Sequence, residues 1–288
     1  MQLVVNIIGA GKIGQTIGRL LVENNLAKIA GVCNKTLESA MAAIEFMGDG
    51  IVIADIPSLP LADITFITVP DDRISDIGLQ ISHTSNIKPN SIYVHCSGVL
   101  TSDVLAAVKI NNVFVASCHP MKSFSDPLIA YKNYPGTYCA MEGDTQASEI
   151  LTPLFQSFGS QIFSIEKDKK PLYHAAGVFA SNYLITLAQQ SLNCFTASGV
   201  EEKIALQMII GLMQSALINL KNTLSPTEAL TGPIQRGDIS TIQKHLAAIS
   251  DSQQRNLYAL LGQFTIPCTT HHLEIKSQLA AALLLEEQ

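Results

Sequence analysis

Two hydrophobic patterns divide the chain. In the first half, short apolar runs such as Leu3–Ile8, Ala27–Cys33 and Asp63–Val69 alternate with stretches of helical period. Runs of this length that are rich in β-branched residues predict strands, and the stretches between them predict helices. Beyond residue 166 the strand-like runs almost vanish and long apolar helical patterns follow. We therefore expect an α/β domain over residues 1–166 and an all-α domain over residues 167–288.

The strand–helix alternation of the first domain is typical of a doubly wound, mainly parallel sheet. Ligands of such sheets bind beyond the carboxyl ends of the strands, so the residues that follow each strand are the first candidates for function. The further strands expected are Gly50–Ile53, Ser91–Val94, Val113–Ser117, Gly136–Met141 and Gln161–Ile165, with a helix over 145–158.

Three glycines follow the first expected strand at the spacing G-x-G-x-x-G, and a helical pattern begins at once. Gly9 lets the chain turn sharply, Gly11 lets backbone amides approach a pyrophosphate, and Gly14 lets the helix pack against the strand. The anion would lie at the helix N-terminus, where unpaired N–H groups favour negative charge. The stretch predicts a dinucleotide site, with a purely structural glycine turn as the alternative. Its residues are Gly9, Ala10, Gly11, Lys12, Ile13 and Gly14.

The tip of the second strand bears on which nicotinamide cofactor binds. An acidic residue about 20 positions beyond the glycines would bond the ribose 2′-hydroxyl and repel a 2′-phosphate. That position holds the neutral Asn34, followed by Lys35 and Thr36. Lys35 could pair with a 2′-phosphate and its polar neighbours could donate hydrogen bonds, which favours NADP over NAD. The alternative is a solvated turn in which Thr36 caps the next helix.

The next strand delivers Val69 and Pro70 to the same edge of the sheet, where their backbone is expected to border the cofactor. Asp71 and Asp72 follow, and we assign both to the first turn of a helix. A later strand delivers Ser97 and Gly98, which offer a hydroxyl and an accessible amide near the nicotinamide.

Two histidines, His95 and His119, lie at the tips of successive strands. Imidazole titrates near neutral pH, so each could bind or protonate a substrate oxygen. Each could equally be a hydrogen-bonded structural residue, which is the commoner role of a single histidine.

The second domain is dominated by two apolar helical patterns, over 171–198 and 200–224. Helices this apolar need a cover, either a second helical layer or a second subunit, so we expect a homodimer through this half. Lys170, His174 and Ser181 share one face at the start of the first pattern. Lys170 and His174 are candidate proton donors, with a solvated lysine and a structural histidine as the alternative.

A loop around Arg236 combines helix caps with one unassigned cation. Ser225 and Asp238 have the sequence context of N-caps. Arg236 could clamp a substrate carboxylate or tie the loop to an internal acid, and we favour the tie. The pair at positions 271 and 272, both histidine, has no companion metal ligands and is interpreted as surface or packing.

Composition narrows the functional classes. The formal net charge is −6 and no basic run is present, which argues against nucleic acid as a partner. The 6 cysteines lack metal-ligand spacing, so no metal site is expected and they are interpreted as free thiols of a reducing compartment. The N-terminal apolar run is too short for a membrane span and lacks the flanks of a signal peptide, so we expect a cytoplasmic protein that does not enter a membrane.

Taken together, the chain resembles the Rossmann-like oxidoreductases whose C-terminal half is domain of unknown function 2520, relatives of ketopantoate reductase, pyrroline-5-carboxylate reductase and the 6-phosphogluconate dehydrogenase group. The resemblance covers nearly the full length. The residues that carry it are Gly9–Gly14, Val69–Asp72, His95–Gly98, His119-Pro120, Tyr173–Ala176, Ala180–Tyr183, Leu230–Pro233 and Arg236–Asp238.

This resemblance implies an NADP-binding domain, an α-helical dimerisation domain and a substrate cleft between them. The Lys-x-x-x-Asn helix pattern of the β-hydroxyacid dehydrogenases is absent, because His174 stands four residues after Lys170. The role of their catalytic lysine is therefore better assigned to His174, with Asn182 nearby.

The expected activity is an NADP-dependent transfer of a hydride between the nicotinamide and a small carbonyl, imine or alcohol. His174 or Lys170 would provide the proton. The residues expected to position the substrate are His119, Ser97 and Asn182. Two alternatives remain open: a sensor or scaffold that binds NADP without turnover, and an oxidoreductase that uses a deazaflavin coenzyme together with NADP.

Overall fold

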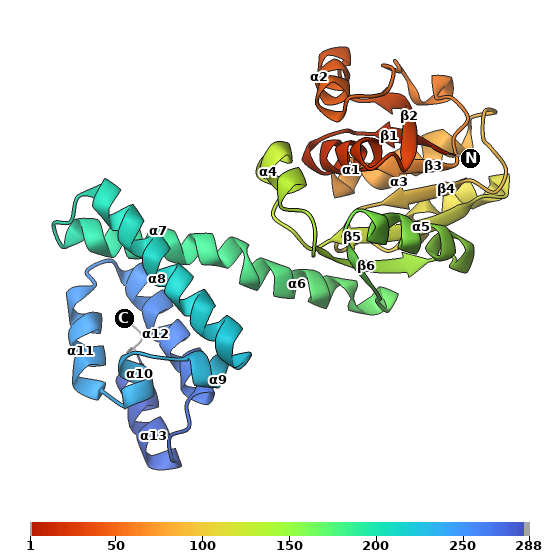
Figure 1. Ribbon diagram of the computed structural model, residues 1–288. Coiled ribbons are helices and arrows are strands. Elements are labelled where there is room, and N and C mark those ends of the chain that lie inside the picture. Colours follow the sequence, from red (N-terminus) through yellow and green to blue (C-terminus); the bar gives the residue numbers. More distant parts are fainter. Residues whose placement is uncertain (1, 285–288) are drawn as a thin grey trace. The chain divides into compact units, whose positions relative to one another are not determined.

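A computed structural model describes residues 2–284, apart from the side chains of residues 110 and 111. The chain divides into two compact units, Met1–Ser181 and Asn182–Gln288, each shown in Figure 1. The sequence places the domain boundary at residue 166, before helix α6 (Lys170–Ala180), whereas the contacts of α6 group it with the first unit. Lys170, the first residue of α6, is buried in the first unit and donates to the carbonyl of Ser97.

The first unit is built on a 7-stranded sheet in the order β2-β1-β3-β4-β5-β6-β7. Neighbouring strands are parallel except for the β5–β6 pair, so the expected doubly wound, mainly parallel sheet is confirmed. The chain order reverses beside β1, which places β2 on one side and β3 on the other. The strands are β1 (Leu3–Ile8), β2 (Ala27–Cys33), β3 (Ile64–Ile67), β4 (Ile92–His95), β5 (Phe114–Pro120), β6 (Tyr138–Gly143) and β7 (Gln161–Ser164).

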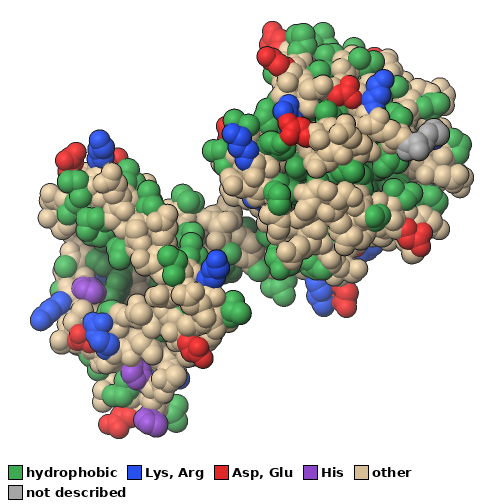
Figure 2. Space-filling model, viewed as in Figure 1, with side chains coloured by type: hydrophobic (Ala, Val, Ile, Leu, Met, Phe, Trp, Pro, Cys, Tyr) green, Lys and Arg blue, Asp and Glu red, His purple; other side chains and the backbone are tan. Residues whose placement is uncertain are grey.

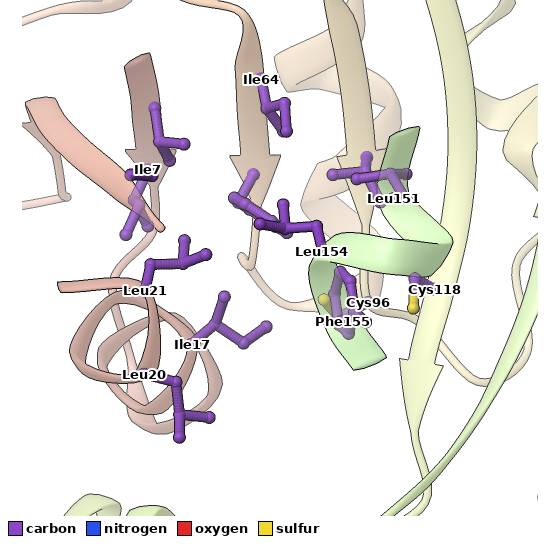
Figure 3. Packing of buried hydrophobic residues seen from close by; sticks show 14 of the residues in the cluster. Ile7, Ile17, Leu20, Leu21, Ile64, Cys96, Cys118, Leu151, Leu154 and Phe155 are labelled. Carbon is purple, nitrogen blue, oxygen red and sulfur yellow. The ribbon is translucent and has the colours of Figure 1, made fainter. Parts of the chain in front are cut away.

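Two hydrophobic clusters cover the two faces of this sheet. On one face α1 (Lys12–Glu23), α2 (Leu37–Met47) and α5 (Thr145–Ser157) pack against the strands, and Figure 3 shows Ile17 and Leu21 of α1 beside Ile7 of β1. On the other face lie α3 (Asp71–Ser82) and the 3₁₀ segments η1 (Ile56–Ser58) and η2 (Ser102–Asn111). Strands β3 and β4 are covered on both sides and buried at every position, which fits their mainly apolar sequences.

The segment expected as a strand over Gly50–Ile53 forms only one bridge, between Val52 and Val32 of β2. It lies at the edge of the sheet beside β2, where the amide of Val32 donates to the carbonyl of Ile51 and the amide of Ile53 donates to that of Val32. Gly50 has a φ of +119°, outside the strand region, so the pairing cannot extend backwards.

The second unit is entirely helical, with a small core of its own around Ile242, Leu246 and Leu279. The pattern over 171–198, expected as one helix, is broken at Ser181, whose φ of −125° and ψ of −64° are not helical. The Ser181 hydroxyl donates to the carbonyl of Gly177, a local bond that competes with helix continuation. The helices are α7 (Asn182–Ala197), α8 (Glu202–Thr223), α9 (Pro226–Ala229), α10 (Pro233–Arg236), α11 (Ile239–Ala248), α12 (Ser252–Thr265) and α13 (Leu273–Ala282), with the 3₁₀ segment η4 (Ile266–Cys268) before α13.

Helix α8 has the longest apolar surface in this unit. Ala205 and Ile209 are its buried residues, while Ile210 and Leu212 are 55% and 62% exposed. Figure 2 shows hydrophobic side chains spread over the surface of the helical unit. By length and composition α8 could cross a membrane, a test that core helices of soluble proteins also pass. Most of the apolar side chains of α8 are thus not covered by the other described helices of the second unit.

Helices α9 and α11 have the N-caps expected from the sequence. The side chain of Ser225 accepts from the amide of Glu228, and that of Asp238 accepts from the amide of Thr241. Arg236 is 64% exposed at its side chain and lies 4.0 Å from the Asp238 carboxylate, which matches the structural tie rather than a clamp for substrate.

Candidate cofactor and active site

Two of the three glycines that follow β1 have no room for a side chain. Gly9 has a φ of +78°, and a Cβ there would lie 2.4 Å from Cγ1 of Val69. A Cβ on Gly14 would lie 2.4 Å from the hydroxyl of Thr68, which itself donates to the carbonyl of Gly9 at 2.8 Å. Thr68, which the sequence analysis did not single out, thus fixes both the turn and the approach of α1 to the sheet.

Gly11 is different, because the space beside it is open. A Cβ there would meet only the carbonyl oxygen of Gly9, at 3.9 Å. Gly11 is the N-cap of α1, so the amides of Lys12 and Ile13 lie in the first turn of a helix, where no intrahelical acceptor is available. Open space beside unpaired helix amides fits a pyrophosphate.

The tip of β2 contacts this loop directly. The Oδ1 atom of Asn34 accepts from the amide of Ala10 at 2.6 Å, so Asn34 holds the glycine loop and only its own amide group is left to donate to a ligand. Lys35 is exposed. Thr36 caps α2 by accepting from the amide of Ser39, the structural alternative considered for this residue.

A cavity of about 590 Å³ opens beside the tips of β1, β2 and β3. This volume lies within the range of small-molecule sites. Val69 and Pro70 border it, as the sequence predicts, together with Asn34 and Lys35. The sequence analysis missed other lining residues that come from the loop before η1 and from α3: Asp55, Ile56, Pro57, Arg73 and Ile77. Arg73 could have been noticed as a cation three residues after Pro70, but the η1 residues carry no motif.

A second group of side chains meets at Gly98, just beyond β4. A Cβ on Gly98 would lie 2.5 Å from Nδ1 of His174 and 2.9 Å from Nε2 of His119. The two imidazole rings are 5.7 Å apart between centroids. The Tyr173 hydroxyl lies 3.3 Å from Nδ1 of His119. The fold thus brings Gly98, His119 and His174 together from three distant segments, and it adds Tyr173, which the sequence analysis quoted only as part of a motif.

Burial controls the protonation of this cluster. Burial, reinforced by the positive charges of His174 and Lys170, lowers the pKa of His119 to about 4, so this imidazole is neutral at physiological pH. Burial also raises the pKa of Tyr173 to about 12. Nδ1 of His174 is buried and, within the described chain, has no hydrogen-bond partner. A buried nitrogen without a partner is costly, which marks it as a candidate ligand contact.

His95 and Ser97 are structural residues. Nε2 of His95 lies 3.1 Å from the carbonyl of Thr101, and Nδ1 accepts from the amide of Ser97 at 3.2 Å. Burial lowers the pKa of His95 to about 4, consistent with a neutral ring that uses both nitrogens. The Ser97 hydroxyl donates to Asp71 at 2.7 Å and accepts from the amide of Leu100 at 2.9 Å. The hydroxyl that the sequence analysis assigned to substrate is therefore used to shape the turn.

Lys170 is a buried residue. Its side chain is 1% exposed, and Nζ donates to the carbonyl of Ser97 at 3.2 Å and to the hydroxyl of Ser117. It lies 3.5 Å from Oε1 of Glu142. The ammonium is therefore bonded to protein groups and is not the solvated lysine of the alternative, and its role as a direct proton donor stays a prediction. Asn182 begins α7 in the second unit, and its role stays a prediction.

Family comparisons match both parts of the chain. A Rossmann-like domain matches residues 1–120, and domain of unknown function 2520 matches residues 137–265. The chain therefore combines a Rossmann-like domain with a DUF2520 domain over the matched residues. A comparison of this Rossmann–DUF2520 protein with curated proteins gave no significant match.

Solved structures share its fold at low sequence identity. A Bacteroides fragilis protein provisionally described as an NADP oxidoreductase has a TM-score of 0.75 at 18% identity, covering 92% of this chain and 98% of that chain. A reductive aminase from Aspergillus terreus, solved with NADPH and ethyl-5-oxohexanoate, has a TM-score of 0.66 at 12% identity, covering 96% and 98%. Pyrroline-5-carboxylate reductase from Coxiella burnetii has a TM-score of 0.61 at 12% identity, covering 98% and 97%.

These comparisons confirm the resemblance for the two domains and for the fold shared with pyrroline-5-carboxylate reductase. The relation of the Rossmann–DUF2520 protein to ketopantoate reductase and 6-phosphogluconate dehydrogenase stays a prediction. The fold is one that nicotinamide-dependent oxidoreductases use, and the substrate does not follow from it.

Proposed function

We propose that the chain is an NADP-dependent oxidoreductase that transfers a hydride between the nicotinamide and a small carbonyl, imine or alcohol substrate. The observation that carries the proposal is the open space beside Gly11, together with the cavity that Gly9, Asn34 and Lys35 line. The fold shared with an NADP oxidoreductase and with a reductase solved with NADPH supports it.

The residues present fit such a cofactor. The amides of Lys12 and Ile13 would hold the pyrophosphate, and the apolar cavity wall at Ile56 and Ile77 would pack against an adenine ring. Lys35 would pair with a 2′-phosphate, and Arg73 lines the same cavity. When bound, the nicotinamide supplies the hydride chemistry, and the protein contributes orientation and a proton.

His174 is the proposed proton donor or acceptor for the substrate. Its Nδ1 atom is buried, has no hydrogen-bond partner among the described residues, and lies against Gly98 close to Nε2 of His119. His119, neutral beside it, would orient the substrate oxygen or nitrogen by a hydrogen bond from or to Nε2.

Calorimetric titration of the purified protein with NADPH and, separately, with NADH tests the cofactor. We expect tight binding of NADPH and weaker binding of NADH, followed by turnover with a panel of small ketones, imines and alcohols. Binding of neither dinucleotide would refute the proposal. Tight NADPH binding with no turnover across the panel would instead favour a sensor or scaffold.

We also propose that the protein is a homodimer through the helical unit. Helix α8 exposes apolar side chains along most of its length, and a second copy is the partner always present at matching concentration. Its location in the cytoplasm stays a prediction.

A further inference from the structure

Lys170 and Glu142 form a buried ion pair between α6 and the sheet. Their side chains are 1% and 5% exposed, and Nζ lies 3.5 Å from Oε1. Glu142 in β6 also accepts from the amide and the hydroxyl of Ser102, both at 2.7 Å. Each charge therefore has several hydrogen-bonding partners, as a buried pair requires.

The remaining bonds of Lys170 reach two other segments of the sheet. Nζ donates to the carbonyl of Ser97, immediately after β4, and to the hydroxyl of Ser117 in β5. One ammonium thus joins the first residue of α6 to groups from β4, β5 and β6 in the middle of the first unit.

This attachment lies next to the histidine cluster in two ways. Ser97, whose carbonyl Lys170 binds, directly precedes Gly98. Tyr173 and His174 follow Lys170 by three and four residues, so they project from the same face of α6. Fixing Lys170 against Ser97 therefore fixes the distance between Gly98 and His174.

We propose that Lys170, paired with Glu142, is a positioning residue that holds Tyr173 and His174 of α6 over Gly98, beside His119. Its contribution to turnover rests on the proposed function, whereas its effect on the histidine cluster can be tested without a substrate. The role differs from that of a catalytic lysine, because Nζ touches protein groups and no open surface.

The charge of Lys170 has a second consequence. The charges that act on His119 are those of His174 and Lys170 on α6, and the Tyr173 hydroxyl lies 3.3 Å from its Nδ1. Glu142 on β6 faces Lys170. After burial and the charge of His174, the charge of Lys170 further lowers the pKa of His119. Removing that charge should make His119 easier to protonate.

Lys170→Gln tests this directly, because glutamine keeps an N–H donor but carries no charge. Histidine titrations by nuclear magnetic resonance resolve the 7 imidazoles of the chain, and we expect the pKa of His119 to rise by about half a unit. Lys170→Arg keeps the charge and should restore the wild-type titration. A purely structural lysine would leave the titration of His119 in Lys170→Gln unchanged, and that result would overturn the proposal.

Lys167→Gln is the matched control. Lys167 lies 4.0 Å from Glu142 but is 43% exposed and pairs with Asp103, so its charge is screened by solvent. We expect no shift of His119 in this variant, and a shift equal to that of Lys170→Gln would also overturn the proposal because it would make the effect unspecific.

If Lys170→Gln does not fold, as judged by circular dichroism, Glu142→Gln replaces it. That variant keeps the cation and removes its counter-charge, so His119 should stay neutral to a lower pH, and an unchanged titration would overturn the proposal.

NADPH titrations distinguish a failure of the proposed function from a failure of the proposed role of Lys170. Both Lys170 variants should bind NADPH as the wild type does. If the wild type does not bind NADPH, the proposed oxidoreductase function is refuted, and the histidine titrations still test the role of Lys170.

Discussion

Asn34 and Lys35 are neighbours at the tip of β2, but their side chains make different contacts. Asn34 holds the glycine loop through the amide of Ala10, while Lys35 is exposed at the cavity. We therefore expect discrimination between NADP and NAD to depend more on Lys35 than on Asn34, because only the lysine brings a charge that a 2′-phosphate can pair with.

Lys35→Glu should weaken NADPH binding by at least tenfold and leave NADH binding within about twofold, since a carboxylate repels the 2′-phosphate but tolerates a hydroxyl. Isothermal titration with both dinucleotides measures this. Lys28→Glu, an equal charge change at an exposed site near the other end of β2, is the control. Equal losses for NADPH and NADH would contradict a 2′-phosphate role for Lys35.

His174→Ala should lower turnover about 10²-fold or more, with NADPH affinity nearly unchanged, because the imidazole faces Gly98 and does not line the cavity. Steady-state kinetics on any substrate found in the panel measures the loss. His245→Ala, which removes a histidine of the second unit that is bonded to Tyr258, is the control. Wild-type turnover in His174→Ala would exclude His174 from the mechanism.

At the scale of elements, α6 and α8 show which features a hydrophobic pattern predicts and which it does not. The pattern correctly predicts that both are helices. It does not predict that α6 ends at Ala180, nor that α6 is attached to the sheet by its first residue. Helix identity depends on neighbours within one or two turns, whereas attachment depends on residues 28 to 73 positions away.

The apolar face of α8 gives the prediction at this scale. Ile210 and Leu217, seven residues apart and 55% and 53% exposed, share one face of the helix. The double variant Ile210→Glu/Leu217→Glu should convert a dimer into a monomer, because each buried branched side chain contributes about 2 kcal/mol. Size-exclusion chromatography with light scattering reports the mass. Leu61→Glu, 53% exposed in the first unit, is the control. A wild type that is monomeric at micromolar concentration would contradict the homodimer.

At the scale of the whole molecule, the buried histidines make stability depend on pH. His95 is 0% exposed, and burial lowers its pKa to about 4, whereas a histidine of the unfolded chain titrates near 6.5. Between these values the unfolded chain binds the proton more readily, so the free energy of unfolding falls as the pH drops from about 6.5 to about 4. The contribution of His95 is on the order of 3 kcal/mol.

Urea unfolding at several pH values between 4.5 and 7 measures this loss. His95→Gln should flatten the dependence, because glutamine takes up no proton. The exposed His83 provides the control, since His83→Gln should keep the wild-type slope. An equally steep dependence in His95→Gln would show that another group, such as His119, dominates the acid loss.

The site could be predicted from sequence only in part, and particular residues show why. Gly9 and Gly14 have the tight contacts that their spacing predicts, because the motif encodes a local turn and one helix contact. Ser97 and Lys170 were assigned to the substrate from their places after a strand and on a helix face, and in the structure their polar groups bond within the turn and attach α6 to the sheet. Residue type indicates what a side chain can do, while its partners decide what it does.

The sequence alone determines the alternation of strands and helices, the glycine turn and the helix caps at Thr36 and Asp238, because these depend on residues a few positions apart. The tertiary structure alone decides that His119 and His174 meet over Gly98 and that Lys170 is buried. The physical reason is that burial and long-range contacts arise only when the parallel strands bring their ends to one edge of the sheet. No local sequence pattern predicts which side chains become buried when the strand ends meet.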